Sequence, residues 1–210
     1  RQGVFPRRSF ARPVATLAFV LAILSPAAIG ASSPEVAVTS SPIRDFLTGS
    51  SERHFGKLEF IGGLSMRSSD PDFGAISSVR FRADGRSFVA VLDTGHWMTG
   101  EIERDSKTGA LSGVSMLHID PMLNENGTAA RRKVDMDAEG LAVRGDRLYV
   151  SYEQFHRIGI YPDKNLAGAK PRGRLPHLIP NNALKRNAGL ETLVASPENW
   201  PLEGALVAVA

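Results

Sequence analysis

The feature that most constrains the fold of this chain is a hairpin pattern that returns at intervals of about fifty to sixty residues. Each copy has two short apolar runs, and in two copies an Asp-Gly or Gly-Asp pair lies between the runs, as in tight turns. The three copies cover residues 78–92, 141–152 and 189–209. Strand repeats of this period are typical of β-propeller blades.

The pattern therefore predicts an all-β fold, a β-propeller of which about three blades are present. A β-sandwich with accidental similarity between its hairpins is the alternative. Closed propellers need about four to eight blades, so we expect an N-terminal fragment that is incomplete at its C-terminus. We assign residues 52–210 to the propeller domain, and the segment 32–51, rich in Ser, Pro and Thr, to a linker.

The first 31 residues have the composition of a secretory signal peptide. Residues 1–13 are basic and contain no acid, residues 14–24 form an apolar run, and small residues follow. Eleven apolar residues are too few to cross a bilayer, and a buried core helix is the alternative. The residues Arg7-Arg8-Ser9-Phe10 also resemble the twin-arginine export motif, so both export routes stay open. We expect a periplasmic or secreted protein without a stable membrane span after signal removal.

The charge and the cysteine content exclude several classes of function. The chain has 25 Lys and Arg against 22 Asp and Glu, and four of the arginines lie in residues 1–31, so the remainder carries 21 − 22 = −1. A net charge this close to zero does not indicate nucleic-acid binding. The chain has no cysteine, which excludes disulfides, thiolate metal sites and a cysteine nucleophile.

Acidic residues recur where the predicted hairpins have their open ends. In an antiparallel hairpin, the start of the first strand and the end of the second lie side by side, opposite the turn. If the innermost strands of successive blades surround one channel, these positions share a rim. Ser77 takes the corresponding place in the first copy and is not acidic. The residues expected at the rim are Asp93, Asp137, Glu139, Glu153 and Glu191.

Carboxylates brought this close repel one another unless a proton or a cation lies between them. Calcium fits this set because it takes about six to eight oxygen ligands in flexible geometry. Zinc fits less well, since the five histidines have no ligand spacing. The alternative is that each acid caps a strand or pairs with a basic neighbour. His96, His156 and Arg157 follow acidic strand ends and are candidate substrate-binding residues.

Three segments give the chain a family resemblance. They are FGAISSVRFRADGRSFVAVLDTGHW (73–97), DMDAEGLAVRGDRLYVSYEQFHRIGIY (135–161) and NAGLETLVASP (187–197). With them the chain resembles the bacterial phytase-like family, which is also called the "esterase-like activity of phytase" family. The resemblance implies an exported β-propeller and calcium-assisted hydrolysis of phosphomonoesters. The matching site positions are the five rim acids, of which Asp93 corresponds to the aspartate of the first blade.

The leading hypothesis is an exported phosphoric ester hydrolase that uses calcium, with Glu139 and Asp137 as catalytic residues. All five rim acids, these two together with Asp93, Glu153 and Glu191, would act as metal ligands. The expected partner is a small phosphorylated or ester substrate, and the full-length protein is expected to be a monomer. A metal-dependent lactonase or carboxylic esterase is an alternative on the same fold. A non-catalytic binding propeller of the cell envelope is the alternative from a different class, because fold alone does not fix function.

Overall fold

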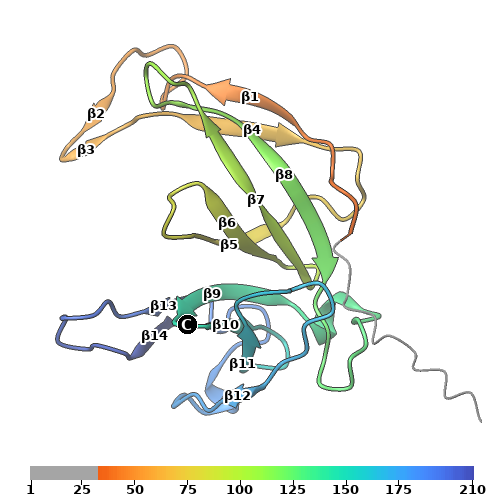
Figure 1. Ribbon diagram of the computed structural model, residues 1–210. Helices are drawn as coiled ribbons and strands as arrows, with labels where there is room; N and C mark the ends of the chain where they lie inside the picture. Colours follow the sequence, from red (N-terminus) through yellow and green to blue (C-terminus); the bar gives the residue numbers. More distant parts are fainter. Residues whose placement is uncertain (1–32) are drawn as a thin grey trace, which may run out of the picture.

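The computed structural model describes residues 33–210. The predicted signal peptide, residues 1–31, lies outside this range and stays a prediction. In the described part the chain forms strands and two 3-10 helices, η1 (Lys133–Asp135) and η2 (Asn181–Ala183), and no α-helix. The prediction of an all-β fold is therefore confirmed (Figure 1). Among residues 33–210, no helix has the length and apolar character of a membrane span.

Two four-stranded antiparallel sheets follow each other along the chain (Figure 1). The first contains β5 (Ile76–Phe81), β6 (Ser87–Leu92), β7 (His96–Arg104) and β8 (Leu111–Pro121). The second contains β9 (Ala138–Arg144), β10 (Arg147–Tyr152), β11 (Arg157–Pro162) and β12 (Gly173–Leu175). In both sheets the order in space is the order in sequence. Such consecutive meanders are consistent with a partial propeller.

Three shorter strand pairs complete the described chain. The third hairpin of the repeat pairs β13 (Thr192–Ala195) with β14 (Leu206–Val209), as the sequence predicts. On the N-terminal side, β1 (Thr39–Ile43) pairs with β4 (Gly63–Arg67), and β2 (His54–Phe55) pairs with β3 (Leu58–Glu59). The range assigned to a linker, 32–51, thus includes a paired strand. It also includes Val36, which is buried in a core cluster.

The predicted turns have the backbone conformations that their residues favour. Gly85 and Gly145 have φ values of 68° and 58°, in the left-handed region that glycine enters without steric cost. In the first of these turns, Asp84 Oδ1 accepts hydrogen bonds from the backbone N–H of Arg86 at 2.8 Å and of Ser87 at 2.9 Å. These contacts fix the register of β5 with β6, which the alternating apolar residues also select.

Apolar side chains join each sheet to the next. One core cluster contains Val89 and Trp97 from the first sheet and Leu141 and Tyr161 from the second. The rings of Trp97 and Tyr161 meet edge to face, with centroids 5.1 Å apart, a geometry that aromatic pairs favour. Another cluster joins the second sheet to β13 and β14. Because the sheets pack face to face in succession, the strand ends of neighbouring sheets come close together.

A close approach of backbones fixes β13 against β9. A Cβ atom at Gly140 would lie 2.7 Å from the backbone nitrogen of Leu193, so the approach requires glycine here. The buried Ser151 hydroxyl accepts a hydrogen bond from Gly140 N at 2.9 Å and donates one to Leu190 O at 2.7 Å. This junction holds Glu191, which follows Leu190, beside the open end of the β9–β10 hairpin.

Candidate metal centre

The register of the β9–β10 hairpin brings three predicted acids together. Ala138 pairs with Tyr152, so Asp137 and Glu153 flank the open end of the hairpin. The backbone N–H of Glu153 donates to Asp137 O at 2.9 Å, which holds the two chain segments together. Glu139 is the second residue of β9. The pairing therefore places acids from both strands at one end, as the antiparallel geometry predicts.

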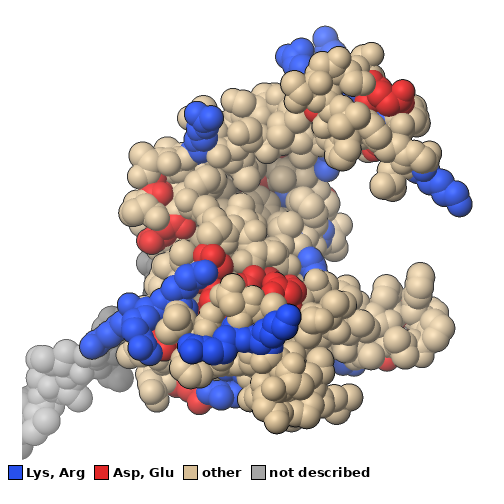
Figure 2. Space-filling view, turned by 180° about the vertical axis from the view of Figure 1, so that it is seen from behind, with Lys and Arg blue, Asp and Glu red and all other residues tan. Residues whose placement is uncertain are grey.

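Asp137, Glu139 and Glu153 form a compact group, here called the acid cluster. One carboxylate oxygen of each residue lies within 4.8 Å of the others. Asp137 and Glu153 are only 2% and 4% exposed, and Glu139 is half-buried. Figure 2 shows acidic side chains gathered beside Lys and Arg side chains near the middle of the face in view. Burial of three carboxylates at this spacing requires protons or a cation.

The other two predicted acids lie at the edges of the acid cluster. Burial together with the neighbouring carboxylates of Glu153 and Asp137 raises the pKa of Glu191. Asp93 follows β6 in the first sheet, and its Oδ2 lies 2.8 Å from Lys133 Nζ. The same ammonium lies 3.3 Å from Asp137 Oδ1. Lys133 thus connects the acid of the first sheet with the acid cluster of the second.

Within the acid cluster, repulsion between carboxylates affects the pKa of Glu139. Burial, followed by the charges of Glu153, Asp137 and Glu191, raises the pKa of Glu139 from 4.5 to about 7. The Ser77 hydroxyl acts in the opposite direction by hydrogen bonding to the carboxylate. Without a bound cation, the Glu139 carboxyl is therefore about half protonated near neutral pH.

Two residues of this centre were missed by sequence reasoning. Ser77 was identified only as the non-acidic counterpart of Glu139, and its contact with that side chain depends on how the two sheets pack. Lys133 lies in η1, four residues before Asp137, outside any predicted strand. The hydrogen bond to Asp93 raises the pKa of Lys133, so it stays a cation over the physiological range. Its spacing from Asp137 was the only sequence signal.

The acid cluster fits a calcium ion by donor type and by spacing. Calcium binds carboxylate oxygens at about 2.3–2.6 Å, so two ligands on opposite sides of the ion are roughly 5 Å apart. The oxygens of Asp137, Glu139 and Glu153 lie within 4.8 Å of one another. Glu153 also has its Oε1 oriented by the backbone N–H of Gly189 at 3.1 Å. These residues can hold a hard cation, the kind of ion that prefers oxygen ligands.

The three predicted substrate-binding residues lie in two places. His156, which is 8% exposed, and Arg157 line an open cavity of about 1110 Å³. His96 is not among the residues that line this cavity. Its Nδ1 lies 3.0 Å from Thr94 Oγ1, and its Nε2 lies 3.9 Å from Asp72 Oδ2. His156 and Arg157 are thus placed together, and His96 is placed apart from them.

The strands and the buried carboxylates define an all-β protein with a candidate cation centre at the end of a hairpin. A family model described as Phytase-like, esterase-like activity of phytase, matches residues 71–209. The match covers both four-stranded sheets and the third hairpin. The chain belongs to this family, as its sequence motifs indicate. No curated protein and no solved structure matches the chain.

Proposed function

We propose that this chain belongs to an exported hydrolase that cleaves phosphate esters with the help of calcium. The observation that carries the proposal is the convergence of Asp137, Glu139 and Glu153, whose oxygens lie within 4.8 Å of one another. Membership of the phytase-like family supports a phytase-like or esterase-like hydrolase. The composition of residues 1–31 supports export to the periplasm or the medium.

In this proposal the acid cluster holds the ion, and Glu191 and the Lys133-paired Asp93 lie at its edges as further oxygen ligands. A bound calcium supplies charge neutralisation for phosphoryl oxygens and lowers the pKa of a water molecule. The Glu153 carboxylate is already oriented by Gly189 N, so it serves as a ligand with little reorganisation. Lys133 neutralises Asp93 and lies 3.3 Å from the buried Oδ1 of Asp137. It thereby reduces the repulsion within the group.

Glu139 is the residue suited to handle the proton of the attacking water. The oxygen of that water bonds to phosphorus while the ester P–O bond breaks, and the leaving alkoxide takes a proton from solvent to become the alcohol. Glu139, or Asp137 beside it, accepts the proton that the water loses. A carboxylate beside the ion can accept this proton as a general base. In an alternative division of roles, Glu139 is a ligand and Asp137 is the base.

The proposal is tested by phosphate release from phytate and from an aryl phosphate, with and without a calcium chelator. We expect release that the chelator abolishes and that excess calcium restores. Glu139→Gln should lower kcat by about a hundredfold or more, because it removes the base or a ligand. Glu198→Gln, at an exposed acid between β13 and β14, is the matched control and should be unchanged. Equal rates with and without chelator would exclude the metal mechanism.

A second candidate, metal-dependent cleavage of carboxylic esters or lactones, is favoured by the esterase-like description of the family. The same acid cluster would polarise a carbonyl oxygen through the ion. Turnover of lactones or aryl acetates without turnover of phosphate esters would select this candidate. Retention of calcium without turnover of either class would instead indicate a binding module.

A further inference from the structure

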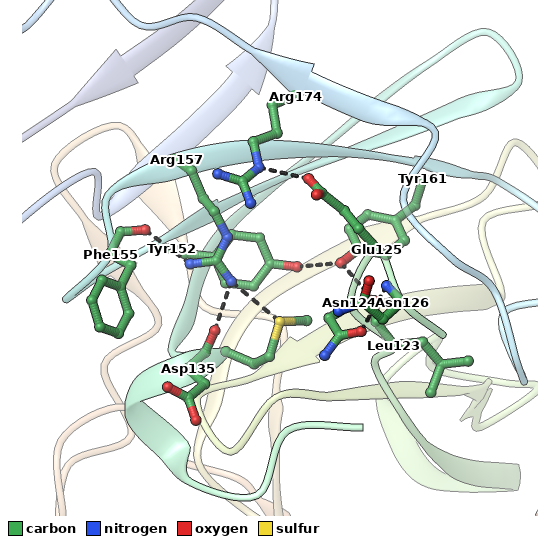
Figure 3. Close-up of polar contacts among 11 residues, drawn as sticks. Leu123, Asn124, Glu125, Asn126, Asp135, Tyr152, Phe155, Arg157, Tyr161 and Arg174 are labelled. Atoms are coloured by element: carbon green, nitrogen blue, oxygen red, sulfur yellow. Dashed lines mark hydrogen bonds and ion pairs between the residues drawn. The ribbon is translucent and has the colours of Figure 1, made fainter. Parts of the chain in front are cut away.

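The open cavity beside the acid cluster is unusually rich in arginine. It has a volume of about 1110 Å³ and is lined by residues of the segment that connects the two sheets, of the β10–β11 turn, and of the region around η2. Five guanidinium groups line it, those of Arg131, Arg132, Arg157, Arg174 and Arg186. Only two acids, Glu125 and Asp135, lie among the lining residues. Figure 3 shows part of this lining around Tyr152 and Arg157.

The two acids of the cavity each neutralise a different arginine. Glu125 Oε1 accepts a hydrogen bond from Arg174 Nε at 2.8 Å (Figure 3). Asp135 accepts two from Arg132, at 2.7 Å and 3.1 Å. The three remaining arginines form no ion pair with an acid in residues 33–210. Five positive and two negative charges leave a surplus of 5 − 2 = 3 positive charges around the cavity.

Arg157 is held rigidly without a counter-charge. Its guanidinium donates to Phe155 O at 2.9 Å, to Asp135 O at 2.7 Å and to Met136 Sδ at 3.2 Å, all of them neutral acceptors. Its Cζ lies 3.9 Å from the centroid of the Tyr152 ring, a cation–π contact visible in Figure 3. Burial lowers the pKa of Arg157, which reflects the loss of water around its charge. Such a group is stabilised when an anion supplies the missing counter-charge.

The contacts of Arg157 leave part of its donor set unused. A guanidinium has five N–H groups, and three contacts with described residues account for three of them. The remaining two have no acceptor within residues 33–210. The planar arrangement of these donors matches the oxygens of phosphate and carboxylate groups, which arginine often binds in bidentate fashion.

The lining of the cavity adjoins the acid cluster along the chain. Asp135 and Met136 line it, and Asp137, the next residue, belongs to the acid cluster. On the other side, the His156 ring lies so close to Gly189 that a Cβ atom there would be 2.5 Å from His156 Nδ1. The Gly189 N–H in turn binds Glu153 of the acid cluster.

We propose that the arginine-lined cavity binds a small molecule with two or more oxyanion groups, with Arg157 as its fixed anchor and Arg186 at its rim. Phosphate and carboxylate groups share this chemistry, and the experiment below distinguishes them. That the ligand is also the substrate rests on the proposed function. The binding itself does not, because the cavity and its surplus charge are independent of any metal.

The test is titration calorimetry of the intact protein in metal-free buffer, with inorganic pyrophosphate as one probe and tricarballylate as the other. We expect binding of at least one probe that weakens as salt is added, because screening reduces the attraction of exposed charges. Arg157→Met should weaken it about tenfold or more, the loss expected for a charge-assisted hydrogen bond. Arg186→Met, at an exposed position that cannot disturb the core, should weaken it about two- to fivefold.

Arg172→Met is the matched control, because Arg172 is exposed, pairs with Asp146 at 3.2 Å and does not line the cavity. The control should bind as the unmodified protein does. Binding of neither probe, or binding that both Arg157→Met and Arg186→Met leave unchanged, would overturn the proposal. If phosphate release persists without anion binding in the cavity, only the cavity assignment fails. If anions bind but no ester is cleaved, only the proposed function fails.

Discussion

Glu139→Gln should have opposite effects on stability with and without calcium. In the metal-free protein, burial and neighbouring carboxylates raise the pKa of Glu139 from 4.5 to about 7. At about 1.4 kcal/mol per unit, this shift corresponds to about 3 kcal/mol of differential stability. Because Glu139 is only half-buried, solvent screening reduces this to about 1–2 kcal/mol. Glutamine has nearly the same shape and no charge, so it avoids this cost.

The sign of the pH dependence follows from the direction of the shift. A raised pKa in the folded state means that the protonated carboxyl stabilises the fold. This contribution is complete below pH 4.5, falls as the pH rises, and is absent above about pH 7. The unmodified protein should therefore lose about 1–2 kcal/mol between pH 4.5 and pH 8 that Glu139→Gln retains.

Urea unfolding with a chelator present, at pH 4.5 and at pH 8, measures the difference. The variant should be about 1–2 kcal/mol more stable than the unmodified protein at pH 8, and equal to it at pH 4.5. With calcium at a hundred times its dissociation constant, the unmodified protein should gain about 2.7 kcal/mol and the variant should gain less. A difference that is the same at both pH values, or that calcium does not reverse, would refute the electrostatic account of the acid cluster.

Two further substitutions test other parts of the structure. Gly140→Ala should destabilise the fold by about 1–3 kcal/mol in thermal unfolding, because the new Cβ atom collides with the backbone of Leu193. The control is Gly63→Ala, where the nearest atoms are at least 3.5 Å from the new Cβ atom. Equal losses of stability in the two variants would contradict the steric argument. Lys133→Met should tighten calcium binding in calorimetry by about threefold or more, because the ammonium near Asp137 no longer repels the ion. Unchanged or weaker binding would contradict this account of repulsion between Lys133 and the ion.

The parts of the fold that the sequence predicted are those that local chemistry determines. The turns at Gly85 and Gly145 combine residues that favour positive φ with alternating strands on either side, so both hairpins could be placed. Antiparallel pairing then predicted that Glu139 and Glu153 lie at one end. By contrast, β1 lies almost entirely exposed and contains Pro42, so it lacks both the alternation and the composition of a strand.

The missed parts of the site depend on contacts between distant segments. The basic cavity gathers residues from positions 124 to 186, and no motif connects them in the sequence. Arg157 was identified from its position after an acidic strand end. Its contact with the Tyr152 ring and its neutral partners became visible only in the structure. The contact of Lys133 with Asp93 likewise joins two sheets, and sequence spacing carries no information on such a pair.

The meander order of the sheets has a consequence for the sequence of events during synthesis. Every strand of the second sheet pairs with a neighbour along the chain, so that sheet can form once residue 175 has left the ribosome. Glu191 and the backbone of Gly189, which orients Glu153, come later. A chain stalled between these points would have two ordered sheets and all three acids of the acid cluster, but Glu153 would lack the backbone N–H that orients it.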